Sequence, residues 1–136
     1  TLVSALIKGN SAFVVNVGDS RCYVVRDDKI TKVTKDHSYV QDLVDSGFLT
    51  EEEAETHPEK NSITRAVGFD YNMTPDAFYV PFFDFLVLCT DGLTNMVDKE
   101  EIKSIILDKI TLDSAVEKLI DKARENGGLD NITVAL

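Results

Sequence analysis

Two aspartates stand at the rims of apolar, strand-like segments. Asp91 follows the run Phe85–Cys89 and precedes Gly92, while Asp130 directly precedes the last apolar run of the chain. An aspartate placed in this way can project its carboxylate into a cleft while its backbone is held by the strand. Carboxylate oxygens are hard ligands that suit Mg²⁺ or Mn²⁺. The pattern is compatible with a divalent metal site, although a turn or cap is the commoner explanation of a single Asp-Gly pair.

Short apolar runs separated by turn residues predict the strands that would position these carboxylates. The runs are Thr1–Ile7, Ala12–Val17, Arg21–Arg26, Ile30–Val33, Phe85–Cys89 and Asn131–Leu136. The strands before position 34 are joined by tight turns, so we expect them to form one antiparallel meander. The almost continuous apolar character of residues 12–17 indicates a strand that is buried on both faces.

Capping signals predict two short, polar helices in the middle of the chain. Ser38 and Thr50 each precede a glutamine or glutamate by three positions, which is the spacing of a capping box. The first helix should end at Gly47 and the second before Pro58. This part of the chain therefore looks like a small insertion outside the core.

Two amphipathic helices are predicted late in the chain. Asp98 caps the first, and its apolar face consists of Ile102, Ile105 and Ile106. The second ends at the Asn-Gly-Gly sequence 126–128 and has apolar residues at helical spacing: Leu112, Ala115, Val116, Leu119, Ile120 and Ala123. Apolar strands followed by such helices indicate one α+β domain over residues 1–136, with sheets packed together and covered by helices.

Five short blocks, in order, resemble the signature motifs of the PPM family of metal-dependent serine/threonine protein phosphatases, and the bacterial type most closely. The blocks are Gly18-Asp19-Ser20-Arg21, Asp36-His37-Ser38, His57-Pro58 with Asn61 and Ile63-Thr64-Arg65-Ala66, Thr90-Asp91-Gly92-Leu93, and Asp130-Asn131-Ile132-Thr133. Each block alone is a weak signal, but together they cover essentially the whole chain with the expected gaps.

The resemblance implies a fold and a reaction. The fold is an α/β/β/α sandwich of two antiparallel sheets flanked by helices, here incomplete at its N-terminus. The reaction is hydrolysis of phosphoserine and phosphothreonine in proteins by a metal-activated water at a centre of two Mg²⁺ or Mn²⁺ ions. Asp91 and Asp130 match two metal-binding aspartates, and Asp19 matches one that helps to hold a third, weaker ion.

The resemblance also implies supporting residues. Gly92 and Asn131 would support the metal-binding loops, with Asn131 orienting the loop of Asp130. Residues 43–61 match a mobile flap beside the active site that tunes substrate access. Its matching positions are Asp45, Gly47, His57 and Asn61, and His57 is expected to anchor the flap.

Three further polar residues have two readings each. His37 could serve as a general acid, but a structural role fits better, because the family does not use this position for catalysis. Arg21 and Arg65 could attract phosphate, but hydrogen bonds to nearby backbone are the commoner role for arginines in such places.

The family pattern also has an N-terminal portion that this sequence lacks. That portion carries an early acidic residue, an Asp-Gly-(Met/Val)-Gly-Gly block and an arginine that meets the substrate phosphate. We therefore expect a fragment that is inactive alone, binds metal weakly and dimerises non-natively through exposed strand edges. The alternative, from another functional class, is a non-catalytic PPM-like module that binds a partner.

Composition limits the other functions. A net charge of −10 argues against nucleic acid as a partner, and no apolar run is long enough to cross a membrane. Cys22 and Cys89 each lie inside a strand-like run, which indicates buried thiols in a reducing cytoplasm. The expected partners are phosphoserine and phosphothreonine proteins and a cognate serine/threonine kinase.

Overall fold

The computed structural model describes residues 1–69, 72–108 and 111–136. Its strands are β1 (Leu2–Lys8), β2 (Ser11–Val17), β3 (Arg21–Arg26), β4 (Lys29–Lys32), β5 (Asp76–Val80), β6 (Phe85–Cys89) and β7 (Val134–Ala135). Its helices are α1 (Tyr39–Asp45), α2 (Glu51–Thr56), α3 (Asp91–Thr94), α4 (Lys99–Leu107) and α5 (Leu112–Glu125).

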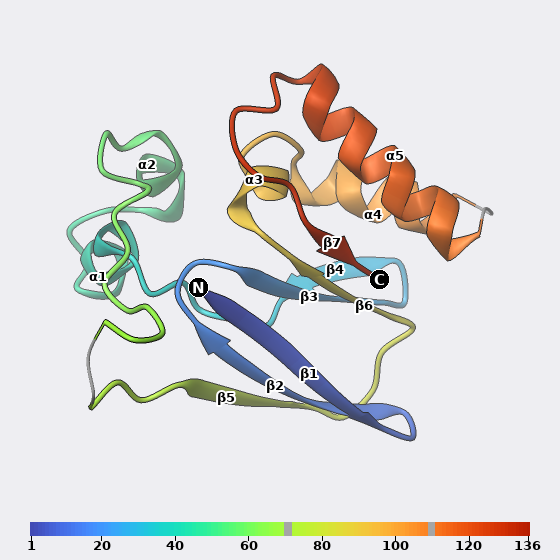
Figure 1. Ribbon diagram of the computed structural model, residues 1–136, viewed down its shortest axis with the longest axis horizontal. Helices are drawn as coiled ribbons and strands as arrows, with labels where there is room; N and C mark the ends of the chain where they lie inside the picture. The colour runs from blue at the N-terminus through green and yellow to red at the C-terminus, as the bar shows by residue number, and fades with distance from the viewer. Residues whose placement is uncertain (70–71, 109–110) are drawn as a thin grey trace.

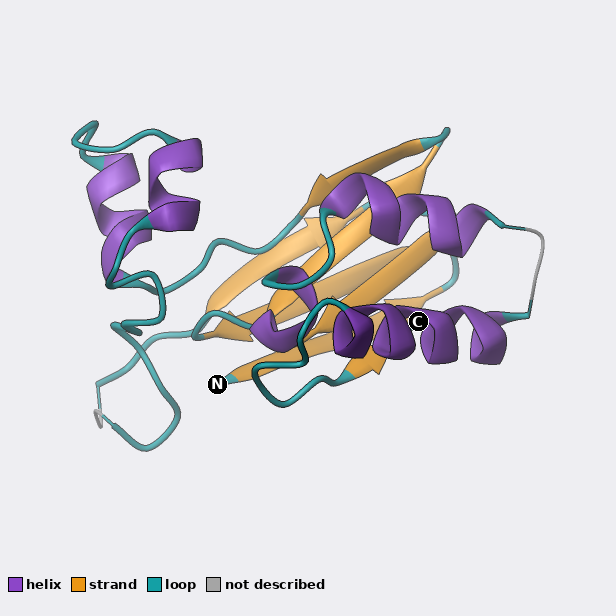
Figure 2. Cartoon of the chain, turned by 90° about the horizontal axis from the view of Figure 1, so that it is seen from above, coloured by secondary structure: helices purple, strands orange, loops and turns teal. Residues whose placement is uncertain are grey.

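The strands form two antiparallel sheets that pack face to face. One sheet has the order β1-β2-β5 and the other β4-β3-β6-β7. Helices α4 and α5 cover the outer face of the second sheet, as Figures 1 and 2 show. In the described parts of the chain no helix lies on the outer face of the first sheet. The predicted sandwich of two antiparallel sheets with helices outside is confirmed.

The predicted four-stranded meander is wrong. β2 and β3 follow each other in sequence but belong to different sheets, so the chain crosses between the sheets at residues 18–20. Gly18 allows this crossing because its φ of +103° lies where residues with side chains are rarely found. β5, which the sequence analysis did not predict, pairs with β2 and completes the first sheet. The turn residues between β2 and β3 did not reveal that the two strands belong to different sheets.

The prediction that residues 12–17 are buried on both faces is wrong at Phe13, although Asn16 and Val17 at the end of the strand are both buried. Ala12 and Val14 are completely buried between the sheets, whereas the side chain of Phe13 is 51% exposed on the outer face. Phe13 lies opposite Tyr79 of β5, with ring centroids 5.0 Å apart. An apolar outer face gives the same sequence pattern as a strand buried on both sides.

Two cores hold the layers together. One lies between the sheets and includes Ala12, Val14, Cys22, Val80 and Leu86. The other lies between the second sheet and the helices, and its fully buried members include Val87, Leu93, Ile102, Leu119 and Ala123. The cysteines are buried and unpaired as predicted, and they belong to different cores. Burial raises the pKa of each thiol to about 12.

The helix caps agree with the sequence analysis. Ser38, Thr50 and Asp98 are N-caps whose side chains accept hydrogen bonds from backbone N–H groups three residues on. Thr111 caps α5 in the same way. The short helix α3 was not predicted, and the closing strand is limited to Val134–Ala135. Local capping chemistry thus accounts for the starts of α1, α2, α4 and α5, whereas α3 begins without a side-chain cap.

Helices α1 and α2 stand apart from the layered body (Figures 1 and 2). They are tied to it at both ends of the segment by backbone hydrogen bonds: Tyr39 N–H donates to Ser62 O at 2.8 Å, and Thr64 N–H donates to His37 O at 2.8 Å. Residues 39–56 thus form a helical hairpin with a narrow base, and the insertion of a flap at about 43–61 stays a prediction. None of the helices in the described residues is long and apolar enough to cross a membrane.

Candidate metal centre

Thr90 joins the loops that carry Asp91 and Asp130. Its backbone N–H donates to Thr133 O at 3.1 Å, and its hydroxyl donates to Asn131 O at 2.9 Å. The same hydroxyl accepts from Thr133 N–H at 3.0 Å. These three bonds hold the end of β6 beside the segment that leads into β7, although the two are about forty residues apart in sequence.

Gly92 makes this approach possible. A Cβ atom at this position would lie 2.3 Å from Asn131 O and 3.4 Å from the carbonyl carbon of Asp130. Both contacts are with backbone, which cannot swing away as a flexible side chain would. The residue after Asp91 must therefore be a glycine for the two loops to pack as they do.

Asp91 and Asp130 differ in their surroundings. Asp91 is the first residue of α3, is half-buried and has its Oδ2 atom 3.5 Å from the side-chain amide of Asn95. Asp130 is exposed, and its Oδ1 accepts from the backbone N–H of Asn131 at 2.6 Å. That bond links the backbone of Asn131 to the conformation of the Asp130 side chain, and the supporting role of Asn131 stays a prediction.

Asp19 lies on the crossing between the sheets, and the charge of Asp91 affects its pKa. Burial raises the pKa of the Asp19 carboxyl above its usual value, and the negative charge of Asp91 raises it further, with a smaller contribution from Asp36. Two carboxylates that repel each other in a half-buried place are stabilised by a cation between them. The crossing thus brings the third predicted ligand towards the first.

The donor set fits Mg²⁺ or Mn²⁺ in chemistry and only partly in number. The carboxylates of Asp91, Asp130 and Asp19 are oxygen donors of the kind these ions prefer. Within residues 1–69, 72–108 and 111–136, no three histidine, cysteine or acidic side chains gather closely enough to hold a metal ion. The structure thus links the three predicted ligands through backbone bonds and charge, without assembling them into one cluster.

Arg21 serves the framework of this region. Its guanidinium donates to Asp36 Oδ2 from Nε at 2.9 Å and from Nη2 at 2.6 Å, and to the Thr94 hydroxyl at 2.9 Å. Lys32 adds a second cation 3.1 Å from Asp36 Oδ1. The structural role favoured for Arg21 is confirmed, but its partners are a carboxylate and a hydroxyl group where backbone was expected. By binding both Thr94 and Asp36, Arg21 connects α3, which begins at Asp91, to the segment that precedes α1.

His37 is likewise a structural residue. It is buried, its Nδ1 atom accepts from Gly18 N–H at 3.1 Å, and its Nε2 atom lies 3.1 Å from Asp76 Oδ2. Arg65 contacts the other oxygen of Asp76 at 3.0 Å. Neither ring nitrogen is free to exchange a proton with a substrate, so the structure supports the non-catalytic reading of His37.

The flap positions are spread over the helical hairpin. Asp45 ends α1 and pairs with Lys35, and Gly47 follows with a φ of +74°. His57 is the C-cap of α2 and its ring lies 6.3 Å from that of Tyr39, a contact that fits an anchoring role. Asn61 is exposed in the returning loop. The function of these residues in substrate access stays a prediction.

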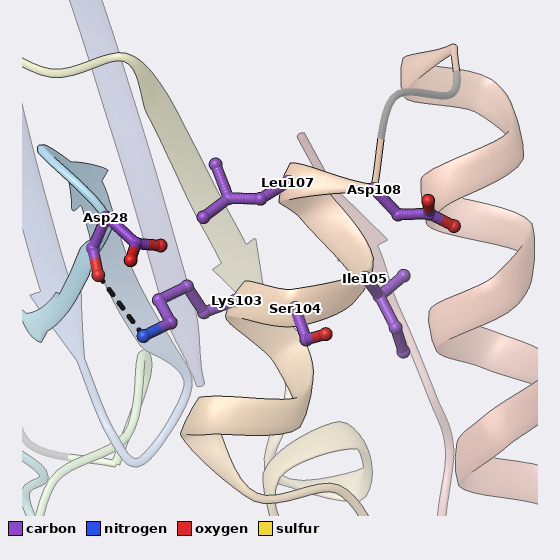
Figure 3. A pocket seen from close by; sticks show the side chains of 6 residues that line it. All are labelled: Asp28, Lys103, Ser104, Ile105, Leu107 and Asp108. Atoms are coloured by element: carbon purple, nitrogen blue, oxygen red, sulfur yellow. Dashed lines mark hydrogen bonds between the residues drawn. The ribbon is translucent and has the colours of Figure 1, made fainter.

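Two recesses lie outside this centre. One of about 410 Å³ beside α4 is shown in Figure 3, where Lys103 Nζ donates to Asp28 O at 3.2 Å; its lining is Asp28, Lys103, Ser104, Ile105, Leu107 and Asp108. Another of about 350 Å³ is lined by Thr64, Arg65, Ala66, Phe69, Asn72, Met73 and Thr74. Neither lining includes a predicted metal ligand.

Three positioning residues escaped the sequence analysis. Thr90 lies within a recognised block and Asp76 lies outside all of them, and the long-range partners of neither residue could be read from local patterns. Asn16 had a detectable signal, because it is the one amide side chain within the apolar run 12–17. It is completely buried, and its Nδ2 donates to Gly18 O and to Lys35 O, each at 3.1 Å.

Comparison with known proteins gives a consistent result. A family model described as protein phosphatase 2C matches residues 1–132. The serine/threonine phosphatase Stp of Listeria innocua is 44% identical over 138 aligned positions, which span 100% of this chain and 55% of that protein. The protein phosphatase PhpP of Streptococcus pneumoniae is 43% identical, with coverage of 100% and 56%. The chain thus spans about half the length of the curated relatives it matches.

Solved structures agree in fold. The crystal structure of the serine/threonine phosphatase Stp1 from Staphylococcus aureus superposes with a TM-score of 0.92 at 41% identity, covering 97% of this chain and 53% of that one. The catalytic domain of the serine/threonine protein phosphatase PstP, in complex with two manganese ions, superposes with a TM-score of 0.81 at 35% identity, with coverage of 97% and 55%.

Proposed function

Because the chain belongs to the protein phosphatase 2C (PPM) family, we propose that it forms part of a metal-dependent phosphatase that hydrolyses phosphoserine and phosphothreonine in proteins. The observation that carries this proposal is the junction of the Asp91 and Asp130 loops. Thr90 makes hydrogen bonds across this junction. Position 92 must be a glycine, because any Cβ atom there would clash with Asn131 O. The junction holds together the two loops that carry these carboxylates, although the loops are remote in sequence.

Asp91, Asp130 and Asp19 would contribute to holding Mg²⁺ or Mn²⁺. When bound, such ions lower the pKa of the attacking water and neutralise charge on the phosphoryl oxygens. The manganese-containing PstP structure supports two ions, and we propose that Asp19 contributes to holding a third and weaker one. This chain would supply three of the metal ligands, and Arg21 and His37 stabilise the loops around them through hydrogen bonds.

The complete site needs the rest of the parent protein. Since this chain spans about 55% of its relatives, we propose that the remaining part supplies further metal ligands and the arginine that meets the phosphate. The parent protein would act on phosphoserine and phosphothreonine proteins together with a cognate kinase. Both cysteines are free and buried, which favours the cytoplasm as its location.

Activity of the full-length protein tests this function. With Mn²⁺ and a phosphothreonine peptide we expect hydrolysis, and we expect Asp91→Asn and Asp130→Asn each to reduce kcat/KM by at least about a hundredfold, since even outer partners of a metal site are worth 10–100-fold. Asp121→Asn, on the exposed surface of α5, is the matched control and should leave the rate unchanged. Full-length protein that binds Mn²⁺ but hydrolyses no phosphopeptide would favour a non-catalytic, partner-binding module.

Metal titration of the isolated chain tests its share of the site. Because the described residues make no three-ligand cluster, we expect calorimetry with Mg²⁺ to show only weak binding. A micromolar site in the isolated chain would contradict the view that ligands are missing from it.

A further inference from the structure

Gly18, the residue before Asp19, is held at both of its backbone polar groups. Its N–H donates to His37 Nδ1 at 3.1 Å, and its carbonyl accepts from His37 N–H at 2.9 Å and from Asn16 Nδ2 at 3.1 Å. His37 and Asn16 are buried, at 4% and 0% exposure. A backbone group paired in this way inside the protein cannot rotate without leaving a buried polar group unsatisfied.

The residues on the other side of Asp19 are also held. The buried Ser20 exchanges a hydrogen bond with the Thr1 hydroxyl at 2.8 Å, and Arg21 is locked to Asp36. Asp19 is therefore a half-buried carboxylate between two fixed neighbours. The direction of its side chain depends on how Gly18 and Ser20 are oriented.

The hydrogen bonds of His37 determine its tautomer. Since Nδ1 accepts the proton of Gly18 N–H, the ring proton must sit on Nε2, and this N–H donates to Asp76 Oδ2 at 3.1 Å. The two ring nitrogens thus do different work. One aligns the crossing loop that carries Asp19, and the other anchors the ring to the first residue of β5.

We propose that His37 is a positioning residue for metal binding, which directs the carboxylate of Asp19 by clamping both backbone groups of Gly18. The proposal rests on the metal-ligand role proposed above for Asp19. Partners that orient a ligand from outside the coordination sphere are typically worth 10–100-fold in metal affinity. The ring acts through Gly18, so it needs no contact with the metal or the substrate.

Two substitutions distinguish the role of Nδ1 of His37 from that of Nε2. In His37→Asn, the amide oxygen can occupy the place of Nδ1 and accept from Gly18 N–H, but nothing reaches Asp76. In His37→Gln, the longer side chain can place its amide N–H near Asp76, but no acceptor is left for Gly18. Both variants lose the imidazole ring, so a general loss of packing affects them alike.

The experiment uses metal-free full-length protein and Mn²⁺ titration by calorimetry. The ion that depends on Asp19 is defined as the one that Asp19→Ala removes. We expect His37→Gln to weaken that ion about tenfold or more, and His37→Asn to restore most of the affinity. Hydrogen exchange of the Gly18 amide in the same metal-free proteins should be faster in His37→Gln than in His37→Asn or the wild type.

Asn16→Leu and Val14→Ala complete the set. Asn16→Leu removes the donor to Gly18 O without touching His37, so it should weaken the same ion and keeps the proposal testable if His37→Gln does not fold. Val14→Ala makes a cavity in the same core, two residues away, and should lower stability while leaving the affinity unchanged.

Equal Mn²⁺ affinity in wild type and His37→Gln, or equal loss in His37→Gln and His37→Asn, would overturn the positioning role. If Asp19→Ala binds as many ions as the wild type, the ligand role of Asp19 fails first. In that case the exchange rate of the Gly18 amide still decides whether the clamp exists, because it is measured without metal.

Discussion

At the scale of single residues, the centre depends on close approaches that only particular side chains allow. Gly92 lies against the backbone of Asn131, and Thr90 uses one hydroxyl both to donate and to accept. Asp76 gathers His37 and Arg65 on its two oxygens. Each of these residues connects segments remote in sequence, so its substitution should affect more than its own element.

Gly92→Ala should lower the free energy of unfolding by about 1–3 kcal/mol, because the new Cβ would meet backbone at 2.3 Å. The displaced loops should also weaken Mn²⁺ binding in the full-length protein. Chemical denaturation and calorimetry measure the two effects. Gly9→Ala is the control. Nothing lies within 4 Å of the new Cβ, so its left-handed backbone is the only source of strain, and Mn²⁺ affinity should not change. Unchanged metal affinity in Gly92→Ala would contradict the importance of the junction.

Asp76 should make stability depend on acid pH. The hydrogen bond from His37 foremost, and that from Arg65, hold the pKa of the Asp76 carboxyl below its usual value. A carboxyl whose folded pKa is depressed contributes stability above its unfolded pKa of about 3.9, and this contribution is lost as the pH falls through the folded pKa. Asp76→Asn should therefore be less stable than wild type at pH 7 and should approach it below pH 4. A constant difference in urea unfolding at both pH values would speak against this role.

At the scale of elements, capping residues start the helices and burial decides how much each helix matters. Asp98 accepts from Glu101 N–H at 2.8 Å and begins α4, which buries Ile102 completely. Thr50 forms a full capping box at α2, yet α2 buries only Ala54. The same capping chemistry therefore serves a core helix and a peripheral one.

Asp98→Ala and Thr50→Ala should differ for this reason. Loss of the cap of α4 should reduce global stability by about 1 kcal/mol in thermal unfolding. Loss of the cap of α2 should leave global stability within about 0.5 kcal/mol and should accelerate hydrogen exchange of the α2 amides only. If Thr50→Ala lowers global stability as much as Asp98→Ala, the helical hairpin folds as one unit with the sheets.

At the scale of the whole molecule, the described chain has one helix-covered sheet and one with an apolar outer face. Leu2, Leu6, Phe13 and Tyr79 expose between 47% and 70% of their surface on β1, β2 and β5. β1 and β5 are also the edges of their sheet. Open edges and large apolar patches favour association with another chain.

We expect the isolated chain to self-associate, as light scattering over a range of concentrations would show. Leu6→Lys places a charge at the edge strand where Leu6 is 70% exposed, and should shift the chain towards monomer without loss of fold. Lys118→Glu on α5, away from this sheet, is the control and should leave the association unchanged. A monomer at every concentration would contradict the expectation.

Features that depend on near neighbours in the chain and on the order of short motifs could be predicted without the structure. Helix caps at Ser38, Thr50 and Asp98, the strand 85–89 and the family assignment all follow from residues close together in the chain. The assignment of β2 and β3 to different sheets, and the contacts by which Thr90 and Gly92 join two loops, became visible only in the folded chain. Those contacts arise where segments remote in sequence pack together, and a local pattern holds no information about which remote backbone it will meet.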